Sequence, residues 1–250
     1  MLKLMDLKKQ LRLFILLLQL CAFEIPTTKG QQSLVNSDKD STATKKLTAI
    51  EGYIVTSNII TIKYHTMPGN DPLKNQNWVG IWQGSQVLYD TPPLRKTLIT
   101  GTTSSGDLAF DSLSLQKKDY IIGYGSGEGN SKVSATLYFR ANVLPFEPGL
   151  SFATNLNVLD YGNNFLVISF QTPLGNVPRS NQNWVGIWKG RSISSNGTNL
   201  IKKRKIYSVI NNDTIAINNL NLTRNTWYTI TYALGSMFTD IVATYTFFNQ

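Results

Sequence analysis

Apolar and polar residues alternate in short runs along most of this 250-residue chain. Residues 60–64 read Ile-Thr-Ile-Lys-Tyr, and residues 133–139, 166–170 and 241–247 keep the same two-residue period. This period predicts β-strands with one buried face. Clusters of Gly, Pro, Asn and Ser separate the runs and predict turns. No stretch after residue 30 has the period of an amphipathic helix, so the pattern predicts an all-β protein.

One segment of the chain occurs twice without change. Residues 75–82, Asn-Gln-Asn-Trp-Val-Gly-Ile-Trp, return as residues 181–188, a spacing of 106 residues (75 to 181). Further along, the spacing grows by two single-residue steps to 108, which pairs Tyr124 with Tyr232. Matches that extend over a whole unit with two small shifts indicate a duplicated domain.

The duplication divides the chain into five parts. We expect a signal peptide over residues 1–30, a flexible leader over 31–46, a first repeat over 47–141, a linker over 142–150 and a second repeat over 151–250. The alternating runs amount to about seven short strands per repeat, which is typical of immunoglobulin-like sandwiches. The predicted fold class is therefore all-β, with two tandem antiparallel immunoglobulin-like β-sandwich domains after a cleaved signal peptide.

The first thirty residues have the layout of a secretory signal. Basic residues precede an apolar run from Leu13 to Phe23, and the small residues Thr28 and Gly30 offer a cleavage point. The run is too short to span a bilayer, which needs about 20 apolar residues. Cys21, the only cysteine, leaves lipidation as an alternative to removal, and after removal no disulfide stabilises the repeats. We expect a secreted or cell-surface protein without a transmembrane segment in the mature chain.

Each repeat contains the strand sequence Asn-Trp-Val-Gly-Ile-Trp, at residues 77–82 and 183–188, and a later segment with tyrosine at both ends, at 120–124 and 228–232. This pattern resembles a diffuse group of sandwich modules that includes the SKICH-type domains and the N-terminal sandwich of purple acid phosphatases. The resemblance implies a non-catalytic module that serves binding or domain packing. The aspartate usual in those families before the tryptophan is asparagine in both copies here, which puts any role of that carboxylate in doubt.

Alternation within the repeated strand puts Trp78, Gly80 and Trp82 on one face and Val79 and Ile81 on the other. If the Val/Ile face is the core, the tryptophans form an exposed shelf suited to a sugar ring or a peptide. If the tryptophan face is the core, Trp78 fills the sandwich centre, as in immunoglobulin domains. We favour a buried Trp78, with Trp82 the better candidate for exposure because it lies near the loops.

The candidate ligand site of each repeat combines this second tryptophan with the amides that precede the strand. Amide side chains pair with sugar hydroxyls or with backbone groups. They also cap turns, and their identity in both copies is compatible with either use or with a recent duplication. The candidate ligand-binding residues are Asn75, Gln76, Asn77, Trp82, Asn181, Gln182, Asn183 and Trp188.

We expect no catalytic site, no metal and no cofactor. His65 is the only histidine, its counterpart is Gln171, and the mature chain has no cysteine. This excludes the usual Ser-His-acid and Cys-His arrangements and most zinc sites. The acidic residues do not recur at equivalent positions, so neither a repeated carboxylate pair nor a calcium-binding loop is indicated.

The charge of the chain is moderately basic. The formal net charge is +9, and removal of the predicted signal, with five bases and two acids, leaves +6. Such an excess does not indicate a nucleic-acid partner. The run at residues 202–205, Lys-Lys-Arg-Lys, fits an anionic surface or, as we favour, a solvated strand end. N-glycosylation triplets at Asn196, Asn212 and Asn221 mark exposed positions if the secretory pathway is eukaryotic.

Together these observations favour a secreted, non-enzymatic binding or adhesion protein that presents loop sites to a glycan or a cell-surface protein. The alternative is a structural or accessory protein whose sandwiches pack on a partner protein, with the tryptophans in the core. The oligomeric state does not follow from the sequence.

Overall fold

The computed structural model describes residues 43–141, 149–194 and 196–250, and it confirms the all-β prediction. The helical elements within these ranges are two 3-10 turns, η1 (Asn130–Lys132) and η2 (Phe238–Asp240). The strands are β1 (Thr44–Leu47), β2 (Ala49–Val55), β3 (Ile60–His65), β4 (Trp78–Gln83), β5 (Arg95–Leu98), β6 (Ser105–Phe110), β7 (Asp119–Gly125), β8 (Val133–Arg140), β9 (Leu150–Ala153), β10 (Asn155–Tyr161), β11 (Phe165–Gln171), β12 (Trp184–Lys189), β13 (Leu200–Lys205), β14 (Asn212–Asn218), β15 (Thr226–Ala233) and β16 (Ile241–Asn249).

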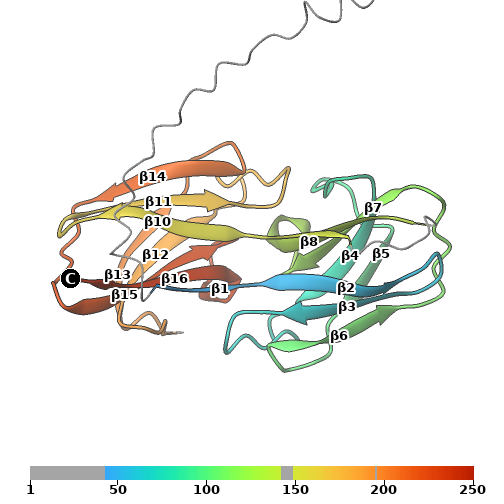
Figure 1. Cartoon of the computed structure of the whole chain (residues 1–250), viewed down its shortest axis with the longest axis horizontal. Helices are drawn as coiled ribbons and strands as arrows, with labels where there is room; N and C mark the ends of the chain where they lie inside the picture. The colour runs from blue at the N-terminus through green and yellow to red at the C-terminus, as the bar shows by residue number, and fades with distance from the viewer. Residues whose placement is uncertain (1–42, 142–148, 195) are drawn as a thin grey trace, which may run out of the picture. The chain divides into compact units, whose positions relative to one another are not determined.

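Each repeat contributes two antiparallel sheets with the same strand order (Figure 1). In the first repeat, β2-β3-β6 form one sheet and β5-β4-β7-β8 belong to the other. In the second repeat, β10-β11-β14 form one sheet and β13-β12-β15-β16 belong to the other. The duplication seen in the sequence therefore extends to the order in which the strands pair.

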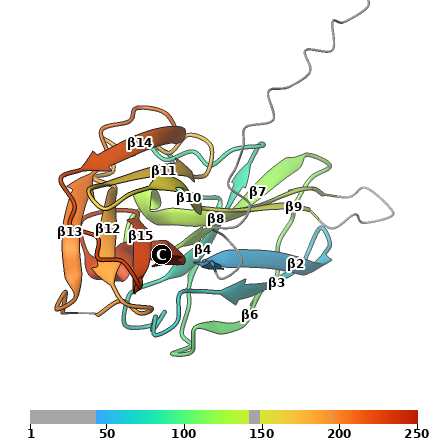
Figure 2. The ribbon, with the colours of Figure 1, turned by 60° about the vertical axis from the view of Figure 1, so that its left-hand side comes forward.

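The larger sheets each gain a fifth strand from the segment that leads into the other repeat. β1, which precedes the first repeat, pairs antiparallel with β16, the last strand of the second, and Leu47 lies opposite Ala243. In the same way β9, at the start of the second repeat, pairs with β8, and Ala153 lies opposite Ala135 (Figure 2). The two repeats thus exchange edge strands reciprocally, and the described residues belong to one compact unit.

Equivalent backbone hydrogen bonds anchor both exchanged strands. The N–H of Thr48 donates to the carbonyl of Val242 at 2.9 Å, and the N–H of Thr154 donates to the carbonyl of Ser134 at 2.8 Å. The pairing satisfies main-chain groups of β16 and β8 that would otherwise lie at the edge of a sheet.

Because of the strand exchange, the predicted leader and the predicted linker both end earlier in the chain than the sequence indicates. The predicted flexible leader extends to Lys46, but residues 44–46 lie in β1, because the backbone of β16 gives this polar segment a strand to pair with. The predicted linker ends at residue 150, which is the first residue of β9. The predicted signal peptide with Cys21, leader residues 31–42 and linker residues 142–148 lie outside the described residues.

The apolar side chains of the predicted alternating runs point into the space between the two sheets of each repeat. On β3, Ile60, Ile62 and Tyr64 are buried, whereas Lys63 and His65 between and after them are exposed. Full burial of one large aliphatic side chain contributes about 1.5–3 kcal/mol. Each repeat holds a cluster of more than a dozen buried apolar residues, so each has a core of its own.

Candidate functional site

The repeated octapeptide leads into β4 in the first repeat and β12 in the second, and each of these strands lies inside its five-stranded sheet. Val79 and Ile81 belong to the sandwich core. Trp78 and Trp82 lie on the opposite face, in a separate buried cluster. The favoured burial of Trp78 is confirmed by its exposure of 0%, and the Val/Ile face is the core, as in the first alternative. The exposed tryptophan shelf and the position of Trp78 at the sandwich centre are both wrong, because the tryptophans are buried on the other face.

The expectation that Trp82 and its counterpart Trp188 are exposed is wrong. Their side chains are 1% and 0% exposed. Trp82 Nε1 donates to the backbone carbonyl of Thr91 at 3.0 Å, and Trp188 Nε1 donates to Thr231 Oγ1 at 3.0 Å. The alternation along a strand does not reveal such cover, because it comes from residues outside the strand, such as Val87 and Thr91 after β4 and Phe238 beside Trp188. No aromatic shelf is presented to a ligand by these residues.

Gly80 and Gly186 separate the tryptophans because the rings fold over them. A Cβ atom at position 80 would lie 2.8 Å from the Trp78 ring. One at position 186 would lie 2.8 Å from both Trp184 and Trp188. The repeated Trp-Val-Gly-Ile-Trp sequence therefore specifies how two rings pack against a sheet.

A lysine on the neighbouring edge strand covers the first tryptophan of each pair. The Nζ atoms of Lys96 and Lys203 lie 4.2 Å from the ring centroids of Trp78 and Trp184, respectively. Such contacts are favourable because the ring face is electronegative. Partial burial lowers the pKa of Lys203. In the basic run of β13, at least this residue therefore serves packing as well as solvation.

Asn77 and Asn183 are buried residues that tie the preceding loop to the sheet. Asn77 Nδ2 donates to Asn70 Oδ1 and to the hydroxyl of Tyr124, both at 2.9 Å. Burial raises the pKa of Tyr124 above its ordinary value, although the bond to Asn77 opposes this. The equivalent bonds of the second repeat, both 3.1 Å long, join Asn183 to Asn176 and Tyr232. These asparagines are not accessible to a ligand, being 0% exposed.

The other four candidate residues form the turn before each repeated strand. Gln76 and Gln182 are exposed and have left-handed backbones, with φ of 55° and 57°. Asn75 and Asn181 are half-buried, and their N–H groups donate to carbonyls four residues earlier at 2.9 and 3.0 Å. The four residues are thus placed in structured turns, and a ligand-binding role for them stays a prediction.

The three predicted glycosylation acceptors, Asn196, Asn212 and Asn221, are exposed. In the first of them, Asn196 Oδ1 accepts a hydrogen bond from the N–H of Thr198 at 3.1 Å. Their exposure agrees with the sequence prediction, and their use as glycosylation sites stays a prediction.

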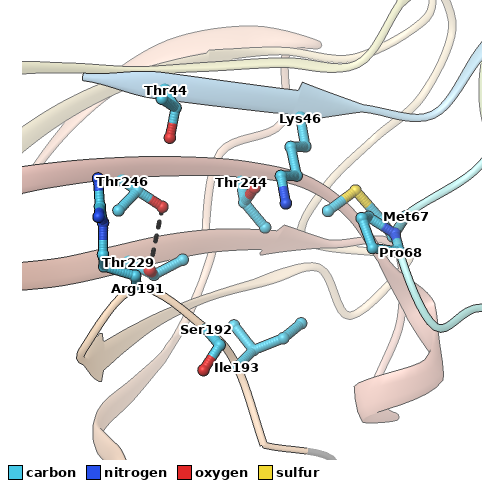
Figure 3. Close-up of a pocket in the computed structure, with 10 residues that line it drawn as sticks. All are labelled: Thr44, Lys46, Met67, Pro68, Arg191, Ser192, Ile193, Thr229, Thr244 and Thr246. Atoms are coloured by element: carbon cyan, nitrogen blue, oxygen red, sulfur yellow. Dashed lines mark hydrogen bonds between the residues drawn. The ribbon is translucent and has the colours of Figure 1, made fainter. Parts of the chain in front are cut away.

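A polar pocket of about 420 Å³ lies on the outer face of the sheet that β1 joins (Figure 3). We call it the threonine pocket. Apolar side chains of the loop after β3, Met67 and Pro68, and of the loop after β12, Ile193, complete its wall. Its principal polar residues are Thr44, Lys46, Arg191, Thr229, Thr244 and Thr246.

The sequence does not indicate this pocket, because its residues come from segments that are distant in the chain. Thr44 and Lys46 come from β1, whereas Thr229 and Thr246 lie on β15 and β16. Only the strand exchange brings the two groups together. The alternation of threonine with apolar residues in residues 241–247 predicts a polar outer face of this strand, but it does not predict which segments lie next to that face.

Across the described ranges, no three His, Cys, Asp or Glu side chains are grouped so that they would hold a metal ion. The same ranges contain no helix with the length and apolar character needed to cross a membrane. No protein-family model matches the chain, and no curated protein is similar to it. The resemblance to SKICH-type and purple acid phosphatase modules therefore stays a prediction.

Proposed function

We propose that the chain is a secreted, non-enzymatic binding protein whose ligand is a glycan on a cell surface. The threonine pocket carries this proposal. Its volume lies in the range of sites for small ligands. A sugar ring presents hydroxyl groups as well as C–H surfaces, and the pocket offers hydrogen-bonding threonines together with Met67, Pro68 and Ile193. We therefore place the ligand site in the threonine pocket, which is formed by both repeats, and not at the repeated tryptophans.

The cellular location and the domain type are part of the same proposal. Secretion or attachment at the cell surface rests on the signal-like residues 1–30. We assign an immunoglobulin-like sandwich to each repeat, over residues 47–141 and 151–250. The supporting observation is the separation of each repeat into a three-stranded sheet and a sheet with four strands of its own.

A glycan array probed with the full chain tests this function. We expect selective binding that is weakened by Thr44→Val, which removes a hydroxyl from the pocket but keeps the shape of the side chain. Gln76→Ala and Gln182→Ala should leave binding unchanged. Absence of binding to any glycan would refute the function. Loss of binding only in the glutamine variants would show that the ligand binds at the turns that contain Gln76 and Gln182.

The second candidate function is that of an accessory protein that packs on a partner, and the buried tryptophans favour it. In addition, Leu150 and Leu174 are 77% and 59% exposed beside an apolar pocket of the first repeat. This candidate predicts that Leu150→Asp with Leu174→Asp abolishes attachment of the chain to cells, measured by flow cytometry, and leaves glycan binding intact. Attachment that depends on Thr44 instead would favour the glycan-binding function.

A further inference from the structure

The charged residues that line the threonine pocket are both cationic. Lys46 and Arg191 lie on two sides of it, with Thr244 and Thr246 between them (Figure 3). None of the described residues that line the pocket is acidic. Among the described residues, neither Lys46 nor Arg191 forms a salt bridge. The pocket therefore carries uncompensated positive charge.

Arg191 is positioned by an aromatic side chain. Its guanidinium carbon lies 3.9 Å from the centroid of the Trp227 ring. Stacking on an aromatic face holds the planar guanidinium in one orientation and leaves its edge N–H groups available. An arginine held in this way is suited to the two oxygens of a carboxylate or sulfate.

The threonine hydroxyls of the pocket differ in whether they already form hydrogen bonds within the protein. Thr229 and Thr246 bond to each other at 3.0 Å, and Thr229 also donates to the carbonyl of Gly190 at 2.9 Å. Within the described part of the chain, the hydroxyls of Thr44 and Thr244 make no hydrogen bond to protein. Thr44 and Thr244 thus offer hydroxyl groups to a ligand from β1 and from β16.

The first repeat has a pocket at the equivalent place, and its chemistry is different. β9 lies beside β8 there as β1 lies beside β16, so Leu150 replaces Thr44 and Phe152 replaces Lys46. The other replacements are Ser85 for Arg191, Ile121 for Thr229 and Tyr138 for Thr246. Among the described residues that line this pocket, hydroxyl groups remain, including that of Thr136 at the place of Thr244, but both cations are absent. Strand exchange alone therefore does not require the polar lining of the threonine pocket.

We propose that the threonine pocket is specific for an acidic sugar, and that each chain carries one such site despite its duplication. The carboxylate or sulfate of the sugar pairs with Arg191 and Lys46, while its hydroxyls bond to Thr44 and Thr244. The equivalent pocket of the first repeat does not bind this ligand, because its described lining residues include no cation. This inference rests on the proposed glycan-binding function and adds the ligand's charge and the stoichiometry.

Isothermal titration calorimetry on the full chain tests the inference with three probes: sialyllactose for a carboxylate, a sulfated disaccharide for a sulfate, and lactose as the neutral control. We expect one of the acidic probes to bind at one site per chain, at least tenfold more tightly than lactose. Arg191→Gln and Lys46→Gln should each weaken binding at least tenfold. Lys117→Gln, the same change at an exposed lysine elsewhere, should have no effect. Unchanged thermal unfolding midpoints will show that the variants are folded.

The outcomes separate this inference from the function on which it rests. If lactose binds as tightly as the acidic sugars, or if two sites are found, the glycan-binding function stands and the acidic, single-site inference fails. If Lys117→Gln weakens binding as much as Arg191→Gln, the attraction is general and the pocket assignment fails. If no sugar binds but polyglutamate does, the ligand is an acidic peptide, and both proposals fail.

Discussion

The Nζ atom of Lys132 lies 2.5 Å from Oδ2 of Asp240, and these two residues occupy the same position in the two repeats. Lys132 ends η1 and Asp240 ends η2, at the spacing of 108 residues (132 to 240) that relates this part of the copies. Contact of a residue with its own counterpart is typical of a twofold-symmetric interface. Identical repeats would bring like charges together here, so the ion pair depends on divergence of the copies.

Variants that reverse the charge of Lys132 alone, or swap the charges of Lys132 and Asp240, test this contact. The side chains are only 17% and 6% exposed, so Lys132→Asp should bury two carboxylates together and lower the free energy of unfolding by about 3–5 kcal/mol. The double variant Lys132→Asp/Asp240→Lys should recover more than half of this loss, measured by urea denaturation. If the two single changes simply add, the residues are not coupled and the account of the interface is wrong.

The buried asparagines should matter for stability and not for binding. Asn77→Ala removes the partner of the buried Tyr124 hydroxyl, and we expect the free energy of unfolding to fall by about 1–3 kcal/mol. Gln76→Asn is the matched control, because the neighbouring residue is exposed and asparagine tolerates its left-handed backbone. The control should stay within about 0.5 kcal/mol of the native chain. Equal losses for the two changes would show that Asn77 has no special structural role.

The buried tyrosines should make the protein sensitive to alkaline pH. Burial raises the pKa of Tyr124 and Tyr232 above the ordinary value of 10.0, so folding favours their neutral forms. Their contribution is complete below pH 10 and is lost as the pH rises above it, by about 1.4 kcal/mol per pH unit for each tyrosine. Tyr124→Phe/Tyr232→Phe should make the free energy of unfolding fall less steeply between pH 10 and 11.5. If the free energy of unfolding falls equally steeply with pH in the native chain and in this variant, the two tyrosines are not the cause of the alkaline sensitivity.

The sequence predicts the features that depend on neighbours along the chain. The alternation at residues 60–64 and the repeated octapeptide are sufficient for the strands and the duplication, but they leave open which face of the Trp-Val-Gly-Ile-Trp strand meets the sandwich core. Burial of Trp82 does not follow from the alternation, because its cover includes the irregular segment after β4, where Val87 joins the tryptophan cluster and Thr91 accepts a hydrogen bond from the indole. The sequence assigns residues 44–46 of β1 to the leader because Thr-Lys-Lys has no apolar residue, whereas the pairing of this strand depends on the backbone of β16. The threonine pocket does not follow from the sequence for the same reason.

Strand exchange is the claim on which the pocket and the contact between Lys132 and Asp240 depend, and a disulfide measures it directly. With Cys21 changed to serine, Leu47→Cys/Ala243→Cys joins two positions that lie opposite each other on β1 and β16. Leu47→Cys/Ala135→Cys is the matched control, because Ala135 is the counterpart of Ala243 in the first repeat and faces Ala153 in the exchanged arrangement. Mass spectrometry of the oxidised monomers should find an intrachain disulfide between positions 47 and 243 and free thiols in the control. A disulfide between positions 47 and 135, or disulfides that join separate chains, would contradict the exchange.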